Sequence, residues 1–392
     1  MTNTSKGILH DVRIVEMSSM GPVPFAAMLM ADMGAEILTI SAPAGRTSEM
    51  PLAADDPLWR GRSRMYLDLK ADGVAKRVLN IIAKAHVLLE GFRPGVMERL
   101  GLGPETCLAE NPELVYGRMS GWGQTGPLKY VPGHDPNYLS LTGALHSIGN
   151  GDLPPVPPLN LVGDFGGGAM YLVAGVLAAL LGVRRGEQGQ VVDAAIVDGV
   201  ASLMTSIFSM RNAGLWRSDS RESNLLDGGA PYGRAYQTSD SKYVMVAAME
   251  PRFYKGLLAL LELDEASLPP RNDPSNWPAL HRIFQEKFKS RSRDEWSELA
   301  QKKEACLTPI LTLAEAPHHP HNVDRNVFAC RDGKRIPSPA PRFQRTPSVL
   351  APPEGAPWQE VLQKWGVETG EVPDEESRID LSVPAVTKAA TS

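Results

Sequence analysis

Short runs of apolar residues alternate with amphipathic stretches along the first half of the chain. Uninterrupted apolar runs of a few residues are typical of buried parallel strands, whereas apolar residues spaced three or four positions apart are typical of helices. The alternation predicts an α/β protein with a parallel sheet. We expect strands at 12–16, 36–40, 65–69, 87–90 and 114–119, and helices at 22–33, 74–84, 104–111, 167–183 and 195–210.

The pattern changes after Leu215. Residues 232–248 predict a β-hairpin with a polar turn, and a helix is expected at 251–261, where a proline suits the first position. Pro-rich and charged helical stretches are expected to follow up to about residue 301, and 316–328 is expected to be a loop. The many prolines of the C-terminal part exclude a long element there. The predicted domains are a large Rossmann-like one over 1–190 with a C-terminal return at about 330–392, linker helices over 191–224, and a smaller α+β domain over 225–325.

The composition narrows the class of protein without identifying it. The chain has 392 residues, 43% of them hydrophobic, with a formal net charge of −5, so neither a nucleic acid nor an anionic membrane is expected as its main partner. Its three cysteines, Cys107, Cys306 and Cys330, lack the spacing of a disulfide framework or a zinc site. An apolar run at 169–183 is interrupted by glycines, which favours a buried helix over a membrane span. No targeting signal is legible, so cytoplasm, peroxisome and mitochondrion all remain open.

One histidine and several carboxylates stand at expected loop-to-helix junctions. His134 and Asp135 lie in the stretch PGHDPNYLSL, Asp164 lies in NLVGDFGGG, and Glu250 lies in MEPRFY. An imidazole together with carboxylates is what a proton-transfer enzyme needs. Structural roles compete with this interpretation, because Asp135 and Asp164 can cap helices and Glu250 suits the positive end of a helix dipole. From the residues alone, both interpretations stay open.

Two other patterns carry less weight. The cluster His318, His319 and His321 is interrupted by a proline and has no carboxylate partner nearby, so it favours a surface loop over a metal site. The glycines at 166–168 do not make the spacing of a phosphate-binding GxGxxG loop. We therefore expect no metal site and no phosphate-binding loop of the GxGxxG type.

Eight short motifs, weak singly, are specific together. They span most of the chain and resemble the family III CoA-transferase (CaiB/BaiF-like) superfamily, on its racemase branch. The motifs are GFRPGVMERLGLGP (91–104), MSGWGQTGP (119–127), GHDPNYLSLTG (133–143), PLNLVGDFGGG (158–168), QGQVVDA (188–194), NLLDGGAPY (224–232), AMEPRFY (248–254) and CLTPILT (306–312).

This resemblance implies an isomerase that racemises the alpha carbon of 2-methylacyl-CoA thioesters by 1,1-proton transfer through an enolate. Inversion needs one acid–base group on each face of the carbon, and the resemblance assigns these roles to His134 and Asp164. Glu250 would orient His134, and the backbone N–H of Asp135 would donate to the enolate oxygen. The resemblance also implies an interlocked homodimer and a place in branched-chain fatty acid metabolism. Coenzyme A is part of the substrate, so no separate cofactor is expected.

The resemblance also implies a CoA site. A basic run of Arg60, Arg62 and Arg64 is a further source of cations for phosphates, although surface arginines are more often simply solvated. The family often has an arginine just before the proline that follows the second strand; this chain has Ala42 there, and Arg46 is the candidate replacement. The residues expected to line the site are Leu67, Asp68, Leu69, Lys70, Gly91, Phe92, Arg93, Arg99, Gly133, His134, Asp135, Pro136, Asn137 and Tyr138.

Two other functions compete with racemisation. A CoA-transferase of the same superfamily would use the Asp164 carboxylate as a nucleophile and form an acyl anhydride. Such transferases usually lack the histidine and glutamate found here as His134 and Glu250, so the isomerase is favoured. A non-catalytic acyl-CoA-binding protein would give no reason to keep three ionisable groups. The acyl chain preferred by the enzyme and its pathway are not legible in the sequence.

Overall fold

A computed structural model describes residues 7–43 and 56–368 of the chain. The chain forms two compact units, which are described here one at a time. The first unit comprises the residues up to Asp135, Gly163–Gly199 and the residues from Pro339 onward. The second unit comprises Pro136–Val162 and Val200–Ser338.

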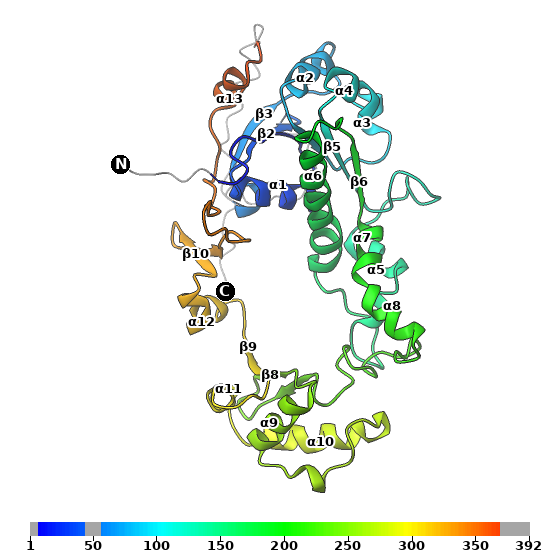
Figure 1. Ribbon diagram of the computed structural model, residues 1–392, viewed down its shortest axis with the longest axis vertical. Helices are drawn as coiled ribbons and strands as arrows, with labels where there is room; N and C mark the ends of the chain where they lie inside the picture. Colours follow the sequence, from blue (N-terminus) through cyan, green and yellow to red (C-terminus); the bar gives the residue numbers. More distant parts are fainter. Residues whose placement is uncertain (1–6, 44–55, 369–392) are drawn as a thin grey trace, which may run out of the picture. The chain divides into compact units, whose positions relative to one another are not determined.

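The first unit is built on a six-stranded sheet in the order β3-β2-β1-β4-β5-β6, with every neighbouring pair parallel (Figure 1). Ile14 of β1 lies opposite Ile37 of β2 on one side and Val87 of β4 on the other. This order is that of Rossmann-like sheets, so the predicted fold class is confirmed. The strands are β1 (Arg13–Met17), β2 (Glu36–Ser41), β3 (Arg62–Tyr66), β4 (Val87–Glu90), β5 (Val115–Ser120) and β6 (Val191–Ala195).

Strand β3 begins three residues earlier than the apolar pattern predicts, because it contains a buried charge. Arg62 is only 1% exposed, and its Nε lies 3.1 Å from Oε2 of Glu16 on β1. The same oxygen accepts a 2.6 Å hydrogen bond from the hydroxyl of Thr39 on β2. An arginine whose charge is neutralised by a carboxylate can therefore lie in the interior of the sheet. In the sequence it is a charged residue, so the apolar pattern does not include it in the strand.

Strand β6 corrects a second expectation. The sequence predicts linker helices over 191–224, yet the first five of these residues extend the sheet, with Val191 opposite Tyr116 of β5. Only the last two residues of β6 are buried, because it is an edge strand. The helices that follow are α7 (Ile196–Leu203) and α8 (Thr205–Asn212).

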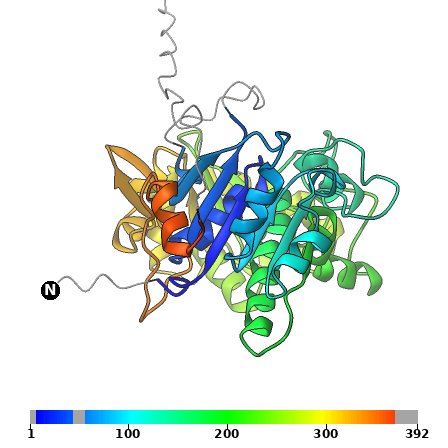
Figure 2. The same cartoon turned by 90° about the horizontal axis from the view of Figure 1, so that it is seen from above.

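Helices cover the sheet, and one of them comes from the C-terminal part. Helix α13 packs beside β3 (Figure 2). Its residues Val361, Leu362 and Trp365 join the core of this unit. The indole N–H of Trp365 donates a 2.6 Å hydrogen bond to Glu36 on β2. The helical elements of this unit are α1 (Pro22–Asp32), η1 (Pro57–Trp59), α2 (Val74–Ile82), α3 (Val96–Arg99), α4 (Pro104–Glu110), the π-helical segment η3 (Leu161–Ala169), α6 (Met170–Val183) and α13 (Trp358–Trp365).

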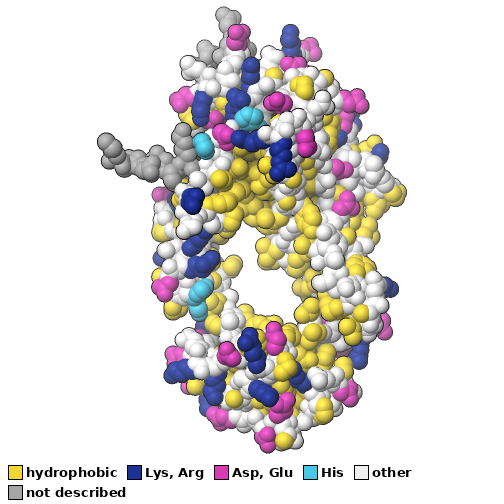
Figure 3. All heavy atoms as spheres, in the orientation of Figure 1, with side chains coloured by type: hydrophobic (Ala, Val, Ile, Leu, Met, Phe, Trp, Pro, Cys, Tyr) yellow, Lys and Arg dark blue, Asp and Glu magenta, His cyan; other side chains and the backbone are white. Residues whose placement is uncertain are grey.

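The continuous helix formed by η3 and α6 is long and apolar enough to cross a membrane by length and composition alone. Core helices of soluble proteins meet the same criterion, and α6 packs against β5 and β6. A Cβ at Gly175 would lie 2.5 Å from Cγ1 of Val192, so glycine permits this close approach. Large apolar side chains stay exposed on the same helix, among them Leu161, Met170, Tyr171 and Leu181. Figure 3 shows hydrophobic side chains gathered at the surface of the molecule.

The second unit contains the antiparallel sheet β7-β8-β9 and the hairpin β10–β11. The predicted hairpin is confirmed by the pairing of β7 with β8, and the predicted helix 251–261 by α9. The expected loop at 316–328 instead contains two short helices, since Pro320 suits a helix start. The strands are β7 (Ala235–Gln237), β8 (Tyr243–Val246), β9 (Leu307–Ile310), β10 (Phe328–Arg331) and β11 (Lys334–Pro337). The helical elements are α5 (Asp135–Leu141), whose first residue still belongs to the first unit, η2 (Leu145–Ser147), α8, α9 (Pro251–Leu261), η4 (Glu265–Ser267), η5 (Pro274–Asn276), α10 (Trp277–Phe288), α11 (Arg293–Gln301), η6 (Ala316–His318) and α12 (Pro320–Asp324).

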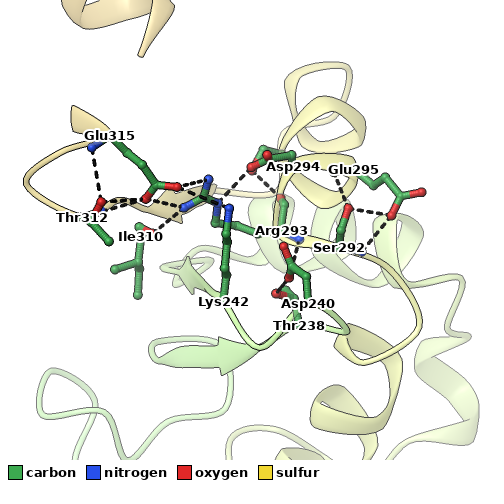
Figure 4. A network of polar contacts seen from close by, with 11 residues as sticks. Thr238, Asp240, Lys242, Ser292, Arg293, Asp294, Glu295, Ile310, Thr312 and Glu315 are labelled. Atoms are coloured by element: carbon green, nitrogen blue, oxygen red, sulfur yellow. Dashed lines mark hydrogen bonds and ion pairs between the residues drawn. The ribbon is translucent and has the colours of Figure 1, made fainter. Parts of the chain in front are cut away.

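A polar network fixes the start of α11 to the turn that follows β9 (Figure 4). Arg293 makes two parallel 2.9 Å bonds to the two carboxylate oxygens of Glu315. The hydrogen bonds from Arg293 hold the pKa of Glu315 well below its usual range. Ser292 and Glu295 add a reciprocal capping box at the same helix end. Because the backbone N–H of Arg293 also donates a 3.2 Å hydrogen bond to Asp240, the network joins three segments of this unit that are distant in sequence.

Candidate active site

The strand order of the sheet reverses between β1 and β4. In open parallel sheets, ligands bind outside the carboxyl ends of the strands at such a reversal. The loop Ser18–Gly21 follows β1 here, and the segment Gly91–Gly95 follows β4. Two stretches that the sequence assigns to CoA, 67–70 and 91–93, directly follow the carboxyl ends of β3 and β4. The topology therefore gathers the predicted contacts at the edge where a ligand is expected.

The Ser18–Gly21 loop is a part of this edge that the sequence did not predict. A Cβ at Gly91 would lie 2.8 Å from Oγ of Ser19, so the loops after β1 and β4 approach closely. Gly21 has φ +84°, and a Cβ there would lie 3.3 Å from Oδ2 of Asp164. The carboxyl of Asp164 is thus placed beside the start of α1. The glycine-proline pair at the helix start after the first strand was the only signal in the sequence.

Asp164 lies on the π-helical segment η3, a type of helix often found at functional sites. Burial, and secondarily the charge of Asp135, raise the pKa of Asp164 to about 6, while the charge of His134 acts in the opposite direction. The next residue on the segment, Phe165, stacks its ring on that of Phe25 with centroids 4.2 Å apart, which ties η3 to α1. Such a carboxyl can both hold and release a proton near neutral pH.

Asp135 has a different role from the one the sequence suggests. Its carboxylate was expected to cap its own helix, α5. Instead, Oδ2 accepts a 2.6 Å hydrogen bond from the backbone N–H of Asp164. Asp135 is 5% exposed, and burial raises its pKa while bonds from the N–H groups of Asp164 and Gly163 lower it. The carboxylate thus satisfies backbone donors near the start of η3, in the way that capping side chains do.

His134 directly precedes α5 and is exposed. Its effect on the pKa of Asp164 places the imidazole within electrostatic reach of that carboxyl. The structure therefore brings His134, Asp135 and Asp164 together. Glu250 is exposed at the N-cap position of α9 in the second unit, and its side chain makes no capping hydrogen bond. Its pairing with His134 stays a prediction.

Some of the residues expected to line the CoA site have exposed side chains, and others have buried ones. Lys70, Arg93 and Arg99 are exposed and present cations at the carboxyl edge. The side chain of Leu67 lies in the core, so only its backbone is available to a ligand. Tyr138 is buried on α5, whereas Asn137 beside it is exposed. Arg46, the candidate replacement for the missing arginine at Ala42, lies outside the described residues.

Of the three arginines in the basic run at β3, Arg60 and Arg62 are wrong as phosphate ligands. Nε of Arg60 donates a 2.8 Å hydrogen bond to Asp32, and its side chain is 4% exposed. Arg62 is bound to Glu16 inside the sheet. Both charges are neutralised internally. Arg64 is partly exposed and lies over the ring of Trp59.

Among the residues that the structure describes, no group of three histidine, cysteine, aspartate or glutamate side chains is arranged to hold a metal ion. The cluster at His318, His319 and His321 falls on η6, at the start of α12 and within α12. This region therefore does not form such a group with its neighbours.

Comparisons with known proteins show what the chain is similar to. The sequence profile of CoA-transferase family III matches residues 9–358. The chain is 41% identical to the alpha-methylacyl-CoA racemase of Mus musculus and 37% identical to that of Homo sapiens, in each case over 93% of this chain and 95% of the relative. A crystal structure of a CAIB/BAIF family protein from Brucella suis superposes with a TM-score of 0.76 at 23% identity, covering 92% of this chain and 99% of that one. The last likeness shows the fold alone.

Proposed function

The chain belongs to CoA-transferase family III, and from this membership we propose that it racemises the alpha carbon of 2-methylacyl-CoA thioesters. Its similarity to two mammalian proteins named alpha-methylacyl-CoA racemase supports this reaction over acyl transfer. The single observation that carries the proposal is the Asp164 carboxyl, whose pKa of about 6 lets it hold a proton within electrostatic reach of an imidazole. A carboxyl of ordinary pKa would be almost fully ionised at neutral pH and could rarely donate.

The proposed reaction moves one proton off the alpha carbon and another proton onto its opposite face. The imidazole of His134 removes the alpha proton from one enantiomer, and the C–H electrons pass into the thioester to form an enolate. The protonated Asp164 then delivers its proton to the other face. For the opposite enantiomer, ionised Asp164 is the base and the His134 imidazolium is the acid, so charge and protons balance in both directions.

Two further groups would lower the barrier. The backbone N–H of Asp135, at the start of α5, is proposed to donate to the enolate oxygen, a contribution of about 3 kcal/mol for a well-placed donor. Glu250 is proposed to hold the His134 ring and stabilise its imidazolium form. Coenzyme A is proposed to bind as part of the substrate along the 67–70 and 91–99 segments. Because the reaction changes no oxidation state, it needs no redox cofactor.

We also propose that the protein works as a homodimer. The helix formed by η3 and α6 keeps Leu161, Met170 and Leu181 about half exposed, at 58%, 49% and 51%. Extended apolar surface of this kind marks an interface in soluble proteins. A second copy of the chain is the proposed occupant, in line with the interlocked dimers that the family resemblance implies. A place in branched-chain fatty acid metabolism is the corresponding proposal for its pathway.

A proton NMR experiment in D2O tests the reaction class. The protein is incubated with one enantiomer of a 2-methylacyl-CoA, and the alpha proton and the optical composition are followed with time. We expect loss of the alpha-proton signal together with formation of the other enantiomer. Passage of the acyl group to an added carboxylic acid without alpha exchange would replace the proposal by CoA transfer. Binding without either change would leave an acyl-CoA-binding protein.

A further inference from the structure

The buried arginine Arg118 on β5 contacts the end of β4 and the helix α3, beside the proposed CoA site. Arg118 lies on β5 directly opposite Glu90, the last residue of β4. Its Nε donates a 2.9 Å hydrogen bond to Oε1 of Glu90. Its Nη1 lies 2.9 Å from Oε1 of Glu98 on α3. Arg118 is 7% exposed and Glu90 is 1% exposed, so the contact between them lies in the protein interior.

The two carboxylates lie at the two ends of the 91–99 segment, which carries four of the proposed CoA contacts: Gly91, Phe92, Arg93 and Arg99. Glu90 immediately precedes Gly91, and its second oxygen, Oε2, accepts a 2.8 Å hydrogen bond from the backbone N–H of Phe92. Glu98 immediately precedes Arg99. The guanidinium of Arg118 therefore binds a carboxylate next to each end of the 91–99 segment, Glu90 before it and Glu98 near its end. A Cβ at Gly103 would lie 2.9 Å from Cγ of Glu98, so the Glu98 side chain also has a fixed neighbour.

We propose that Arg118, held between Glu90 and Glu98, is a positioning residue that fixes the 91–99 segment in the conformation that binds coenzyme A. The inference rests on the proposed function, because that function assigns the CoA part of the substrate to this segment. Arg118 itself touches no ligand in this account. Its planar guanidinium offers separate donors to two carboxylates at a fixed angle, which a lysine cannot reproduce.

The same contact makes CoA binding dependent on pH. Burial raises the pKa of Glu90 to about 7, although Arg118 and the N–H of Phe92 act against the shift. The charged and titratable groups near Glu90 are Arg118 and Tyr116 on β5 and Glu98 on α3. Only the ionised carboxylate accepts from Arg118 and Phe92 with both oxygens. The affinity for coenzyme A should therefore rise as the pH rises through about 7.

The test measures coenzyme A binding by calorimetry on the full chain, together with kcat and KM for one enantiomer of a 2-methylacyl-CoA. For Arg118→Lys we expect Kd and KM to rise by about tenfold or more, the loss expected for one charge-assisted hydrogen bond, with kcat within about threefold of wild type. Glu90→Gln should bind with similarly reduced affinity and lose the change in Kd between pH 6 and 8. Glu98→Gln should have a smaller effect, because the side chain of Glu98 is 45% exposed.

A matched control separates positioning from general destabilisation. Asp32→Asn breaks the buried pair of Asp32 with Arg60 in the same unit, at a place that makes no proposed ligand contact. Asp32→Asn, Glu90→Gln and Arg118→Lys each break a buried ion pair, so all three should lower the unfolding midpoint. Asp32→Asn alone should leave the Kd for coenzyme A unchanged. If folded Arg118→Lys and Glu90→Gln bind coenzyme A as wild type does, the inference is wrong and the proposed function stands. If the wild type itself binds no coenzyme A, both are wrong.

Discussion

The backbone N–H of Asp164 donates a 2.6 Å hydrogen bond to Oδ2 of Asp135. This bond joins the start of α5, where the proposed enolate donor lies, to the π-helical segment that carries the proposed acid. It also brings a second negative charge to Asp164, which adds to the effect of burial on its pKa. The Asp135 side chain therefore helps to position Asp164 and adds to its proton affinity.

Asp135→Asn should lower the pKa of Asp164. Asparagine can still accept the bond from the Asp164 N–H through its carbonyl oxygen, but it removes the charge that raises the pKa of Asp164. Proton delivery by Asp164 should then slow at pH 7.5, by about tenfold for each unit that the pKa falls, and racemisation with it. Carbon-13 NMR titration of the Asp164 carboxyl measures the shift. An unchanged pKa would show that the charge of Asp135 is not felt there.

Gly21→Ala should impair activity more than stability. Its methyl group would lie 3.3 Å from Oδ2 of Asp164, and the φ of +84° adds strain of about 1–3 kcal/mol. Gly186→Ala is the matched control, because Gly186 has φ +91° and a Cβ there meets nothing within 4 Å. Both variants should lower the unfolding midpoint. Only Gly21→Ala should lower kcat, by about tenfold or more if the methyl moves the carboxyl by 1 Å. Equal kcat values in the two variants would contradict the proposed contact.

The stability of the protein should depend on pH through Asp164. Its folded-state pKa is raised from 3.8 to about 6, so its protonated form is favoured by folding. That contribution is fully present below about pH 4 and is lost as the pH rises through about 6. Asp164→Asn has no such loss, and between pH 4 and 7.5 it should gain on the order of 2–3 kcal/mol relative to wild type. Denaturant unfolding at the two pH values measures this. A constant difference would mean that the carboxyl is solvated.

Arg271 should act on catalysis through Glu250. Its guanidinium lies over the rings of both Tyr232 and Tyr254, and Nη1 donates a 3.1 Å hydrogen bond to the carbonyl of Met249, the residue before Glu250. Arg271→Ala should lower kcat by displacing this turn and cost on the order of 1–3 kcal/mol of stability. A double-mutant cycle on kcat with Glu250→Gln measures the coupling. Additive losses would restrict Arg271 to a structural role.

Elements of the fold that depend on local pattern could be predicted. The strand at 87–90 and the helix at 251–261 have the predicted bounds. Strand β3 was misplaced because Arg62 is neutralised by Glu16, which lies 46 residues away in the sequence. Strand β6 was missed because an edge strand buries too few residues to leave an apolar run. The start of β3 and the existence of β6 both depend on contacts between residues that are distant in the sequence.

The candidate site shows the same division. Motifs sufficed to name His134, Asp135 and Asp164, which the structure brings together. They could not reveal that Asp135 binds the N–H of Asp164, or that Gly21 leaves room for that carboxyl. Arg60 was misjudged because its partner, Asp32, lies 28 residues earlier and is fully buried. The sequence alone does not show whether an arginine forms an ion pair inside the protein or is available to a ligand.

The central claim is that His134 and Asp164 serve opposite faces of one carbon. Exchange of the alpha proton in D2O, measured separately for each enantiomer with His134→Ala and Asp164→Asn, tests it most directly. We predict that neither variant racemises, and that each retains exchange with one enantiomer only, a different one for each variant. Wild-type exchange of both enantiomers by either variant, or racemisation by either, would contradict the account.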